Sequence, residues 1–506
     1  MRTKRAIYNF LTDFFPLILM TVIGLFRLKL FTLILGEELN GLSQTYANIM
    51  GYLMIMDGGL GSALIYRLFK PLADNDTKKI SSLAAGAKRI FRIVSWLILG
   101  VGILASFFVF NFIKLEDSSL LTSGYIQMTF VLYLMSAVIP YFVIVYSSMF
   151  EAGQRKYVTN MVNQPVMIIK SIIEIIFILN GLGFVAILVL MIVSNLTAAL
   201  IIYILARKAF KEVDFNQEEK NYEMMGDVKH LLVHKVGSLV AYNIDIVLVS
   251  SMIGVKEVST YAAYNFITSN LMTMIGKITY SVTAGIGDLL ARDRARAFSV
   301  FNEFNALSFF IASIICVPLV LVFNPFIQIW MEGAISTSWT LAILFVLQLL
   351  YYLIRMPLIA YTNAAGLFKE TRICPIIESV VNLTLSLILI QVIGIPGILI
   401  GTFIAYLVSD YFIKPIIIYR KVFNEKVLPY YLRNSFYLIV MVISTYGGYL
   451  LIPYLPFTGY ITWFLSSLLI FVINGILTLI IYIVFKQAPF MKRVKEILIR
   501  KGWLKA

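Results

Sequence analysis

Residues Thr21–Arg67 read TVIGLFRLKLFTLILGEELNGLSQTYANIMGYLMIMDGGLGSALIYR. Two apolar runs are joined by a polar turn at Gly36–Glu38, and charged residues lie inside both runs. Arg27 and Lys29 lie in the first run, and Asp57 lies in the second. Ionised side chains are costly in the bilayer core, so they usually face the interior of a helix bundle or a water-filled cavity. We therefore expect a transporter with a polar cavity rather than an inert membrane anchor.

The composition of the whole chain is that of a multi-spanning membrane protein. Of its 506 residues, 60% are hydrophobic and only 14% are charged. Long apolar runs predict an all-α integral membrane fold, because a membrane β-barrel would show short alternating segments instead. The cysteines and histidines are too few for a disulfide framework or a strong metal motif, so we expect neither a metal site nor a cofactor. They are Cys316, Cys374, His230 and His234.

Apolar runs of about 20 residues predict about fourteen transmembrane helices. The predicted spans are Ala6–Leu35, Leu42–Phe69, Arg89–Phe112, Tyr125–Ser148, Thr159–Asn180, Phe184–Ala206, Leu231–Ile253, Val258–Val282, Ser299–Phe326, Trp339–Ala364, Ile373–Ile393, Gly397–Tyr419, Asn434–Pro453 and Ile461–Phe485. The predicted domains are an N-terminal six-helix bundle (1–206), a solvated cytoplasmic linker (207–229), a C-terminal six-helix bundle (230–420), two extra helices (434–485) and a basic amphipathic tail (486–506).

The distribution of Lys and Arg between the loops predicts the orientation. Nearly all loop cations lie on the side of the N-terminus, whereas the opposite side offers only Lys114 and Lys256. Because cytoplasmic loops carry the excess of Lys and Arg, both termini are predicted to be cytoplasmic. This asymmetry accounts for the formal net charge of +15 without a nucleic-acid partner. The basic tail is expected to lie on the anionic inner leaflet.

The chain repeats itself when it is shifted by 218 positions. Six identities fall in the window of the opening stretch: Gly36/Gly254, Tyr46/Tyr264, Leu53/Leu271, Met54/Met272, Met56/Met274 and Gly58/Gly276. The second copy starts after six predicted spans, and an even number of spans makes the two copies parallel. The sequence therefore predicts two parallel six-helix repeats around a central cavity, followed by two C-terminal helices.

Charged residues inside the predicted spans are the candidates for function. Those near span ends, which we expect to reach the interface by snorkelling, are Asp13, Lys235, Glu378 and Lys414. The deeper residues and the intermediate Lys277 supply the predicted site. The predicted substrate-binding residues are Arg27, Lys29, Lys170, Lys277 and Arg355, and the predicted coupling or gating residues are Asp57, Glu174 and Asp245.

Two of these assignments leave alternatives open. Lys170 and Glu174 are four residues apart, so they either neutralise each other on one helix face or contact a substrate. Arg27 aligns with Asp245 in the repeat, and this pair would be a latch between the halves. Alternatively, Arg27 and Lys29 grip an anionic headgroup, because Arg forks onto phosphate oxygens and Lys supplies a point charge.

With these residues in view, the chain resembles the polysaccharide, or Wzx-type, flippases of the multidrug/oligosaccharidyl-lipid/polysaccharide exporter superfamily. The resemblance rests on Arg27, LGEELNGL at 35–42, DGGL at 57–60 and NID at 243–245 before Ile253-Gly254. It implies movement of an undecaprenyl-pyrophosphate-linked oligosaccharide (a capsule, O-antigen or exopolysaccharide unit) across the bacterial cytoplasmic membrane. The implied mechanism is alternating access through a cationic cavity. Coupling to a proton or sodium gradient, and a polysaccharide polymerase or chain-length protein as partner, stay open.

Three other functions were weighed against this one. A multidrug/cation antiporter of the same superfamily would use Asp57 or Asp245 as its exchanging carboxylate, and a lipid II flippase would carry a related cargo. A membrane enzyme of polysaccharide synthesis needs a polar catalytic region at the outer face. The predicted outer loops are too short for one, as at Gly181–Gly183 and Gly394–Pro396. We therefore predict a transporter and not an enzyme.

Overall fold

The computed structural model describes residues 2–57, 59–116, 121–225, 244–491, 493, 495 and 499. The described residues form helices and no strand. They divide into two compact units, Met1–Ala262 and Ala263–Ala506. Several predictions fall outside the described residues: those on Gly58, His230, His234, Lys235, Asn243, and most of the tail after residue 491.

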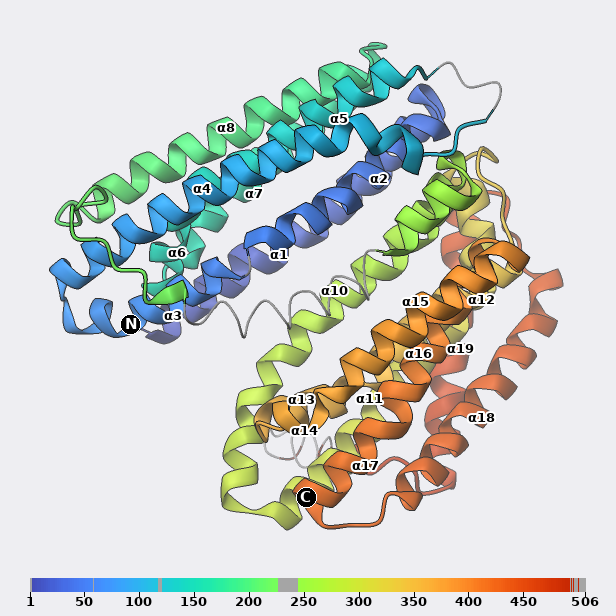
Figure 1. Cartoon of the computed structure of the whole chain (residues 1–506). Helices are drawn as coiled ribbons and strands as arrows, with labels where there is room; N and C mark the ends of the chain where they lie inside the picture. The colour runs from blue at the N-terminus through green and yellow to red at the C-terminus, as the bar shows by residue number, and fades with distance from the viewer. Residues whose placement is uncertain are drawn as a thin grey trace. The chain divides into compact units, whose positions relative to one another are not determined.

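The first unit is built from long helices interrupted by short turns of different pitch (Figure 1). Its α-helices are α1 (Arg2–Leu30), α2 (Glu37–Leu53), α3 (Leu60–Asp74), α4 (Thr77–Val109), α5 (Ser123–Val138), α6 (Ile144–Ala152), α7 (Lys156–Leu179) and α8 (Phe184–Ala209). Its shorter elements are the π-helical turns Phe31–Leu35 and Val249–Ile253 and the 3₁₀ turns Met54–Asp57, Phe110–Phe112 and Ile139–Phe142.

The second unit has the same kind of construction. Helix α10 (Val255–Arg292) begins in the first unit and continues into the second. The other helices are α11 (Arg294–Trp330), α12 (Trp339–Ile354), α13 (Met356–Ala364), α14 (Phe368–Thr371), α15 (Ile373–Ile393), α16 (Ile395–Tyr406), α17 (Lys414–Ile418), α18 (Leu428–Leu451) and α19 (Tyr460–Val484). Shorter elements are the π-helical segments Leu407–Ile413 and Tyr419–Phe423 and the 3₁₀ turn Ile452–Tyr454.

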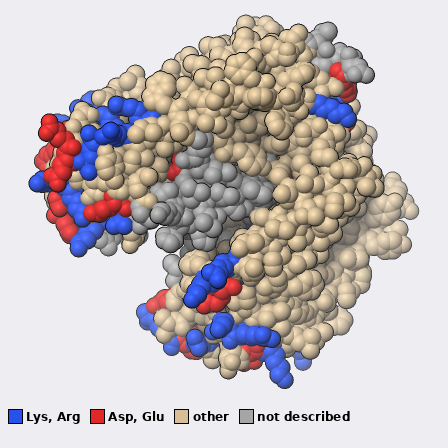
Figure 2. Space-filling view, in the orientation of Figure 1, with Lys and Arg blue, Asp and Glu red and all other residues tan. Residues whose placement is uncertain are grey.

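Within the described residues, eleven helices are long and apolar enough to cross a membrane. Three further predicted spans correspond to α2 with α3, to α10, and to the apolar helix Ile244–Ile253 that ends the predicted seventh span. The described residues thus bear out eleven of the fourteen predicted spans as single long helices. Figure 2 shows Lys and Arg near the ends of helices and mainly other residues along their lengths. The predicted fold class, an all-helical multi-pass membrane protein, is confirmed.

The internal repeat reappears in the backbone. The π-helical turns Phe31–Leu35 and Val249–Ile253 have the same length, lie 218 positions apart, and each ends at a glycine. Gly36 has a φ of 97°, a conformation that favours glycine. The identity of Gly36 and Gly254 therefore belongs to the same local structure in both copies. Further along the copies differ, since Met54 and Met56 lie in a 3₁₀ turn whereas Met272 and Met274 lie within α10.

The helix starts that follow the two repeat-related turns pack against each other in the first unit. Asn40 Nδ2 donates to Ser259 Oγ (2.9 Å), and Ser259 donates to the carbonyl of Glu37 (2.6 Å). A Cβ atom on Gly41 would collide with the carbonyl oxygen of Val255. Glycine at this position therefore allows the start of α2 to approach the start of α10 closely.

The segment that follows α8 differs only in part from the solvated linker that was expected, since most of its described residues are exposed. Phe215 and Met224 are fully buried, because the chain folds back over α4. The N–H of Asn221 donates to the carbonyl of Ser82 (3.0 Å), and Lys88 Nζ donates to Asn216 Oδ1 (2.7 Å). The described part of this segment is thus attached to α4 by a few contacts while most of its side chains stay exposed. The domain boundaries drawn from the sequence stay predictions.

Candidate functional site

Three charged side chains meet between α1 and α7 in the first unit. Arg27 Nε donates to Glu174 Oε1 (2.6 Å), and Lys170 Nζ lies 3.0 Å from Glu174 Oε2. We call Arg27, Lys170 and Glu174 the first cluster. Lys170 and Glu174 are one turn apart on α7, so their side chains share a face of that helix. The contact between them that the sequence suggested is confirmed.

The first cluster has a surplus of positive charge. Glu174 is fully buried, whereas the Arg27 and Lys170 side chains keep exposed fractions of 35% and 21%. One carboxylate faces two cations, and the partly buried Lys29 lies two residues after Arg27 on α1. A buried Glu174 without partners would be strongly destabilising, so the cations hold it in place while keeping part of their own surface accessible.

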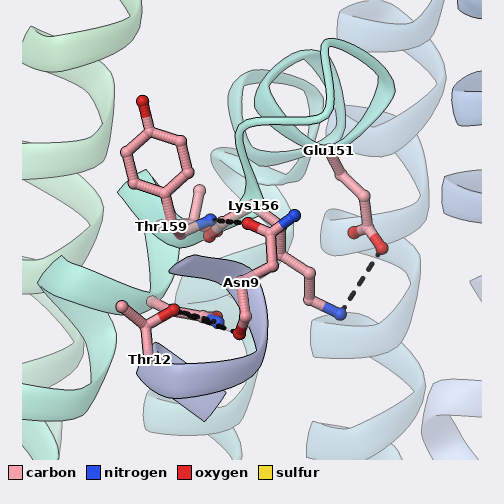
Figure 3. A network of polar contacts seen from close by, with 7 residues as sticks. Asn9, Thr12, Glu151, Lys156 and Thr159 are labelled. Carbon is pink, nitrogen blue, oxygen red and sulfur yellow. Dashed lines mark hydrogen bonds and ion pairs between the residues drawn. The ribbon is translucent and has the colours of Figure 1, made fainter. Parts of the chain in front are cut away.

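The relative position of α1 and α7 is also held nearer the N-terminus (Figure 3). Asn9 Oδ1 accepts from the N–H of Tyr157 (2.7 Å), and Asn160 Nδ2 donates to Thr12 Oγ1 (3.3 Å). Close by, Lys156 forms an ion pair with Glu151 (3.5 Å). These contacts hold the start of α7 against α1, and they therefore help to keep Arg27 opposite Glu174 further along the two helices.

The repeat suggested that Arg27 would pair with Asp245, but the structure shows a different partner for each residue. Arg27 pairs with Glu174, and Asp245 accepts a hydrogen bond from the Tyr261 hydroxyl (3.1 Å). The repeat aligns positions along the chain, but the neighbour of each side chain depends on which helices pack together. Arg27 is adjacent to α7, so its partner comes from that helix.

Asp245 is a buried acid with an unused oxygen. Its Oδ2 accepts from Tyr261, but its Oδ1 has no hydrogen-bond partner among the described residues. The hydroxyl of Tyr52, which interacts electrostatically with Asp245, is also buried and without a partner in the described part of the chain. Buried polar atoms are nearly always satisfied, so these two atoms are exceptions among the described residues.

Asp57 lies at the break between α2 and α3. Its Oδ1 accepts from the N–H of Gly59 (2.9 Å), and its Oδ2 accepts from the hydroxyl of Tyr141 (3.2 Å). Gly59 has a φ of 81°, and Tyr141 lies in the turn that separates α5 from α6. Asp57 therefore connects two helix interruptions and sits at the N-terminal end of α3, where a negative charge is favourable.

The second unit contains a second ionic cluster, formed by Arg355, Asp410, Lys414 and Glu378. Arg355 Nη1 lies 3.5 Å from Asp410 Oδ2, and Lys414 forms an ion pair with the same carboxylate. The Ser409 hydroxyl donates to Glu378 Oε2 (3.3 Å). With two cations and two acids, the second cluster is balanced in charge.

Aromatic rings enclose the guanidinium of the second cluster. The Cζ atom of Arg355 lies 5.4 Å from the ring centroid of each of three tyrosines, Tyr351, Tyr352 and Tyr406. The Arg355 side chain is only 8% exposed. Arg355 was predicted to bind substrate, and this structure places it in a closed environment with Asp410.

Two residues of the second cluster were expected to snorkel from span ends, and that expectation is wrong. Glu378 and Lys414 instead lie in the interior of the second unit beside Asp410. The four-residue spacing of Asp410 and Lys414 was a signal for their pairing that the sequence analysis did not use. Lys277, the remaining predicted cation, is partly buried on α10.

Comparison with known proteins agrees with this architecture. The sequence model of a family described as "Polysaccharide biosynthesis protein" matches residues 10–286, more than half of the chain. The chain belongs to this family. No curated protein sequence matches the chain significantly.

Solved structures share the fold over most of the chain. A lipid II flippase MurJ structure in an inward closed conformation has 18% sequence identity and a TM-score of 0.66, and the match covers 95% of this chain and 99% of that chain. An inward-facing multidrug resistance MATE family transporter of the MOP superfamily has 17% identity and a TM-score of 0.63, with 78% and 92% covered. The bent form of the Vibrio cholerae MATE transporter VcmN has 16% identity and a TM-score of 0.53, with 84% and 98% covered. At these identities the likeness establishes the fold.

Proposed function

We propose that this protein is a flippase that moves an undecaprenyl-pyrophosphate-linked oligosaccharide from the inner to the outer leaflet of the bacterial cytoplasmic membrane. The observation that carries the proposal is the first cluster, where two partly accessible cations share one buried carboxylate. A diphosphate offers several anionic oxygens, which suit the fork of Arg27 and the point charge of Lys170. Membership of a polysaccharide biosynthesis family supports this class of cargo.

In this mechanism Glu174 is the counter-ion that the cargo replaces. Without cargo, Glu174 neutralises Arg27 and lowers the cost of holding a cation at bilayer depth. An arriving diphosphate competes for Arg27 and Lys170, with Lys29 adding charge from the same helix. Alternating access then carries the bound headgroup across. The protein makes and breaks no covalent bond in this process, so it acts as a transporter and not as an enzyme.

The other predicted site residues have proposed roles that follow from their surroundings. Lys277 contributes positive charge in the second unit, and Arg355 contributes only in a conformation that opens its contact with Asp410. Asp57 gates movement at the helix interruptions. Asp245 is the proposed coupling group for a proton or sodium gradient, because its Oδ1 has no hydrogen-bond partner among the described residues. Membrane lipids and a polysaccharide polymerase or chain-length protein are the proposed partners.

One observation favours a second candidate function, a multidrug/cation antiporter. The buried Asp245, with Tyr52 and Tyr261 beside it, is the kind of acidic and aromatic environment that suits a cation. A lipid II flippase is the third candidate, since its cargo carries the same diphosphate chemistry as the proposed one. Transport of an organic cation that depends on Asp245 and is indifferent to Arg27 would favour the antiporter.

The proposed function is tested by transport of a fluorescent lipid-linked oligosaccharide in proteoliposomes that contain the purified protein. We expect Arg27→Ala and Lys170→Ala to lose transport while keeping a normal level of inserted protein. Lys78→Ala is the matched control, because Lys78 is a highly exposed cation paired only weakly with Glu219 (3.6 Å). Normal transport by both cluster variants would overturn the proposal.

The proposed orientation has a separate test. A cysteine introduced at Glu37, the first residue of α2, should react with an impermeant reagent added outside intact cells. A cysteine introduced at Lys78, at the start of α4, should react only after the membrane is permeabilised. The reverse pattern would place the termini outside the cytoplasm.

A further inference from the structure

We propose that the second unit binds the phosphate headgroup of an anionic phospholipid at its predicted cytoplasmic end, at a site separate from both ionic clusters. The site is a cavity of about 800 Å³ between the start of α11 and the loop that leads into α18. We call it the headgroup pocket, and it is lined by Phe298, Asn302, Arg420, Asn424, Glu425, Lys426, Pro429 and Arg433.

The charges of the headgroup pocket favour an anion. Arg420, Lys426 and Arg433 face one acid, Glu425, so the lining residues carry two surplus positive charges. Glu303, next to Asn302 on α11, is already paired with Arg493 (2.8 Å) and does not cancel this surplus. Arg and Lys are the residues that bind phosphate oxygens, and basic pockets between membrane helices on the cytoplasmic side hold anionic lipid headgroups.

The backbone of the loop brings these cations together. Asn424 adopts a left-handed conformation (φ 57°), which ends the helical run at Phe423. The chain then turns back, and the N–H of Glu425 donates to the carbonyl of Tyr419 (3.0 Å). As a result the headgroup pocket is lined both by Arg420, which precedes the turn, and by Lys426, which follows it.

The third cation of the pocket is held in place by hydrogen bonds. Arg433 Nη2 donates to Asn302 Oδ1 (2.7 Å), and Arg433 Nε donates to the carbonyl of Pro429 (3.2 Å). Another lining residue, Phe298, packs against Phe423 with ring centroids 4.9 Å apart. A guanidinium fixed in advance loses little conformational entropy when it binds a ligand.

An apolar surface beside the pocket favours a phospholipid over free phosphate. Leu428 and Leu432 lie one turn apart on α18, next to Pro429 and Arg433, and both side chains are well exposed. An acyl chain would cover these leucines while the headgroup phosphate occupies the pocket. Inorganic phosphate would use the cations alone.

The test measures lipid binding by the purified full-length protein without transport cargo, so its outcome does not depend on the proposed flippase activity. The probes are dihexanoyl phosphatidylglycerol, dihexanoyl phosphatidylcholine and inorganic phosphate, each titrated by calorimetry. We expect phosphatidylglycerol to bind more tightly than the other two. The double variant Arg420→Gln/Lys426→Gln should weaken that binding by about tenfold, because each basic residue contributes to attraction for an anionic lipid.

Matched variants separate the pocket from general surface charge. Lys369→Gln/Arg372→Gln removes two exposed cations of the same unit outside the pocket and should leave binding unchanged. Arg433→Gln should also weaken binding and Arg433→Lys should restore part of it, with melting temperatures confirming that each variant is folded. Unchanged phosphatidylglycerol binding in the Arg420→Gln/Lys426→Gln protein would overturn the site. Equal binding of inorganic phosphate or of phosphatidylcholine would overturn the assignment to an anionic phospholipid.

Discussion

The two ionic clusters are built from the same three parts but differ in access. Each has a buried carboxylate and a lysine four residues away along the same helical run. Each also has an arginine from a part of the chain that is distant in sequence. In the first cluster these are Glu174, Lys170 and Arg27. In the second cluster Glu378 adds a second acid and three tyrosine rings surround Arg355. The first cluster therefore keeps surplus charge and accessible surface, whereas the second is balanced and closed.

This difference separates two uses of charge in a membrane protein. A closed and balanced cluster has satisfied its charges internally, and removing one member leaves another charge buried without compensation. An open cluster with surplus charge can exchange its internal counter-ion for an external anion. Residue types alone do not distinguish these cases, because both clusters combine Arg, Lys and a carboxylate.

The largest expected effect concerns the stability of the second cluster. Asp410→Asn should lower the free energy of unfolding by about 3–5 kcal/mol, because Arg355 and Lys414 then lose the carboxylate between them. Thermal unfolding in detergent measures the effect, and Glu425→Gln, at an exposed acid, is the control. Glu174→Gln should destabilise less, since its partner cations are partly exposed. Equal losses in Asp410→Asn and Glu174→Gln would break the comparison.

The next effect concerns transport by the first cluster. Arg27→Ala should reduce the transport rate by about tenfold to hundredfold, because a hydrogen bond to a charged group contributes about 1.5–3 kcal/mol. The proteoliposome assay measures the rate at equal amounts of inserted protein. The melting temperature should also fall, because the buried Glu174 keeps only one of its two cations. Arg27→Lys should retain part of the activity, as it keeps the charge but not the fork. Wild-type transport in Arg27→Ala would remove the basis for treating the first cluster as a binding site.

A substitution of the counter-ion Glu174 tests whether the two clusters differ in their binding of diphosphate. Glu174→Gln should bind farnesyl diphosphate about tenfold more tightly than the wild type, because the internal competitor for Arg27 and Lys170 is gone. Calorimetry measures the affinity. Glu219→Gln is the matched control, because Glu219 is an exposed acid that pairs only weakly with Lys78 (3.6 Å), and it should leave this affinity unchanged. Weaker binding by Glu174→Gln would contradict the exchange of counter-ion for cargo.

The smallest expected effect concerns a single hydroxyl. Ser409→Ala removes the hydrogen bond to Glu378 and should lower the free energy of unfolding by about 1 kcal/mol, with no change in diphosphate binding. Thermal unfolding measures this loss. Ser299→Ala, which removes an exposed hydroxyl near Glu303, should have almost no effect. A change in diphosphate affinity caused by Ser409→Ala would show that the second cluster is not closed.

Contacts between neighbouring turns were predictable, and contacts between distant helices were not. The spacing of Lys170 and Glu174 predicted that they share a face of α7, because helix geometry alone brings such residues together. Arg27 could be placed at bilayer depth, but its partner Glu174 lies 147 residues away and depends on the packing of α1 against α7. The repeat pointed to Asp245 instead, since sequence alignment carries no information on which helices are neighbours.

The amino-acid sequence by itself determined that the chain crosses the membrane many times and which charged residues lie within the apolar runs, and it indicated an internal repeat. Hydrophobic length, residue identity and local helix geometry are sufficient for these features. The tertiary structure alone decided that the Arg27 side chain keeps accessible surface while the Arg355 side chain is enclosed. It also decided that Phe215 and Met224, in the otherwise polar segment after α8, are buried. Burial depends on the neighbours that folding brings together, and those neighbours come from parts of the chain far apart in sequence.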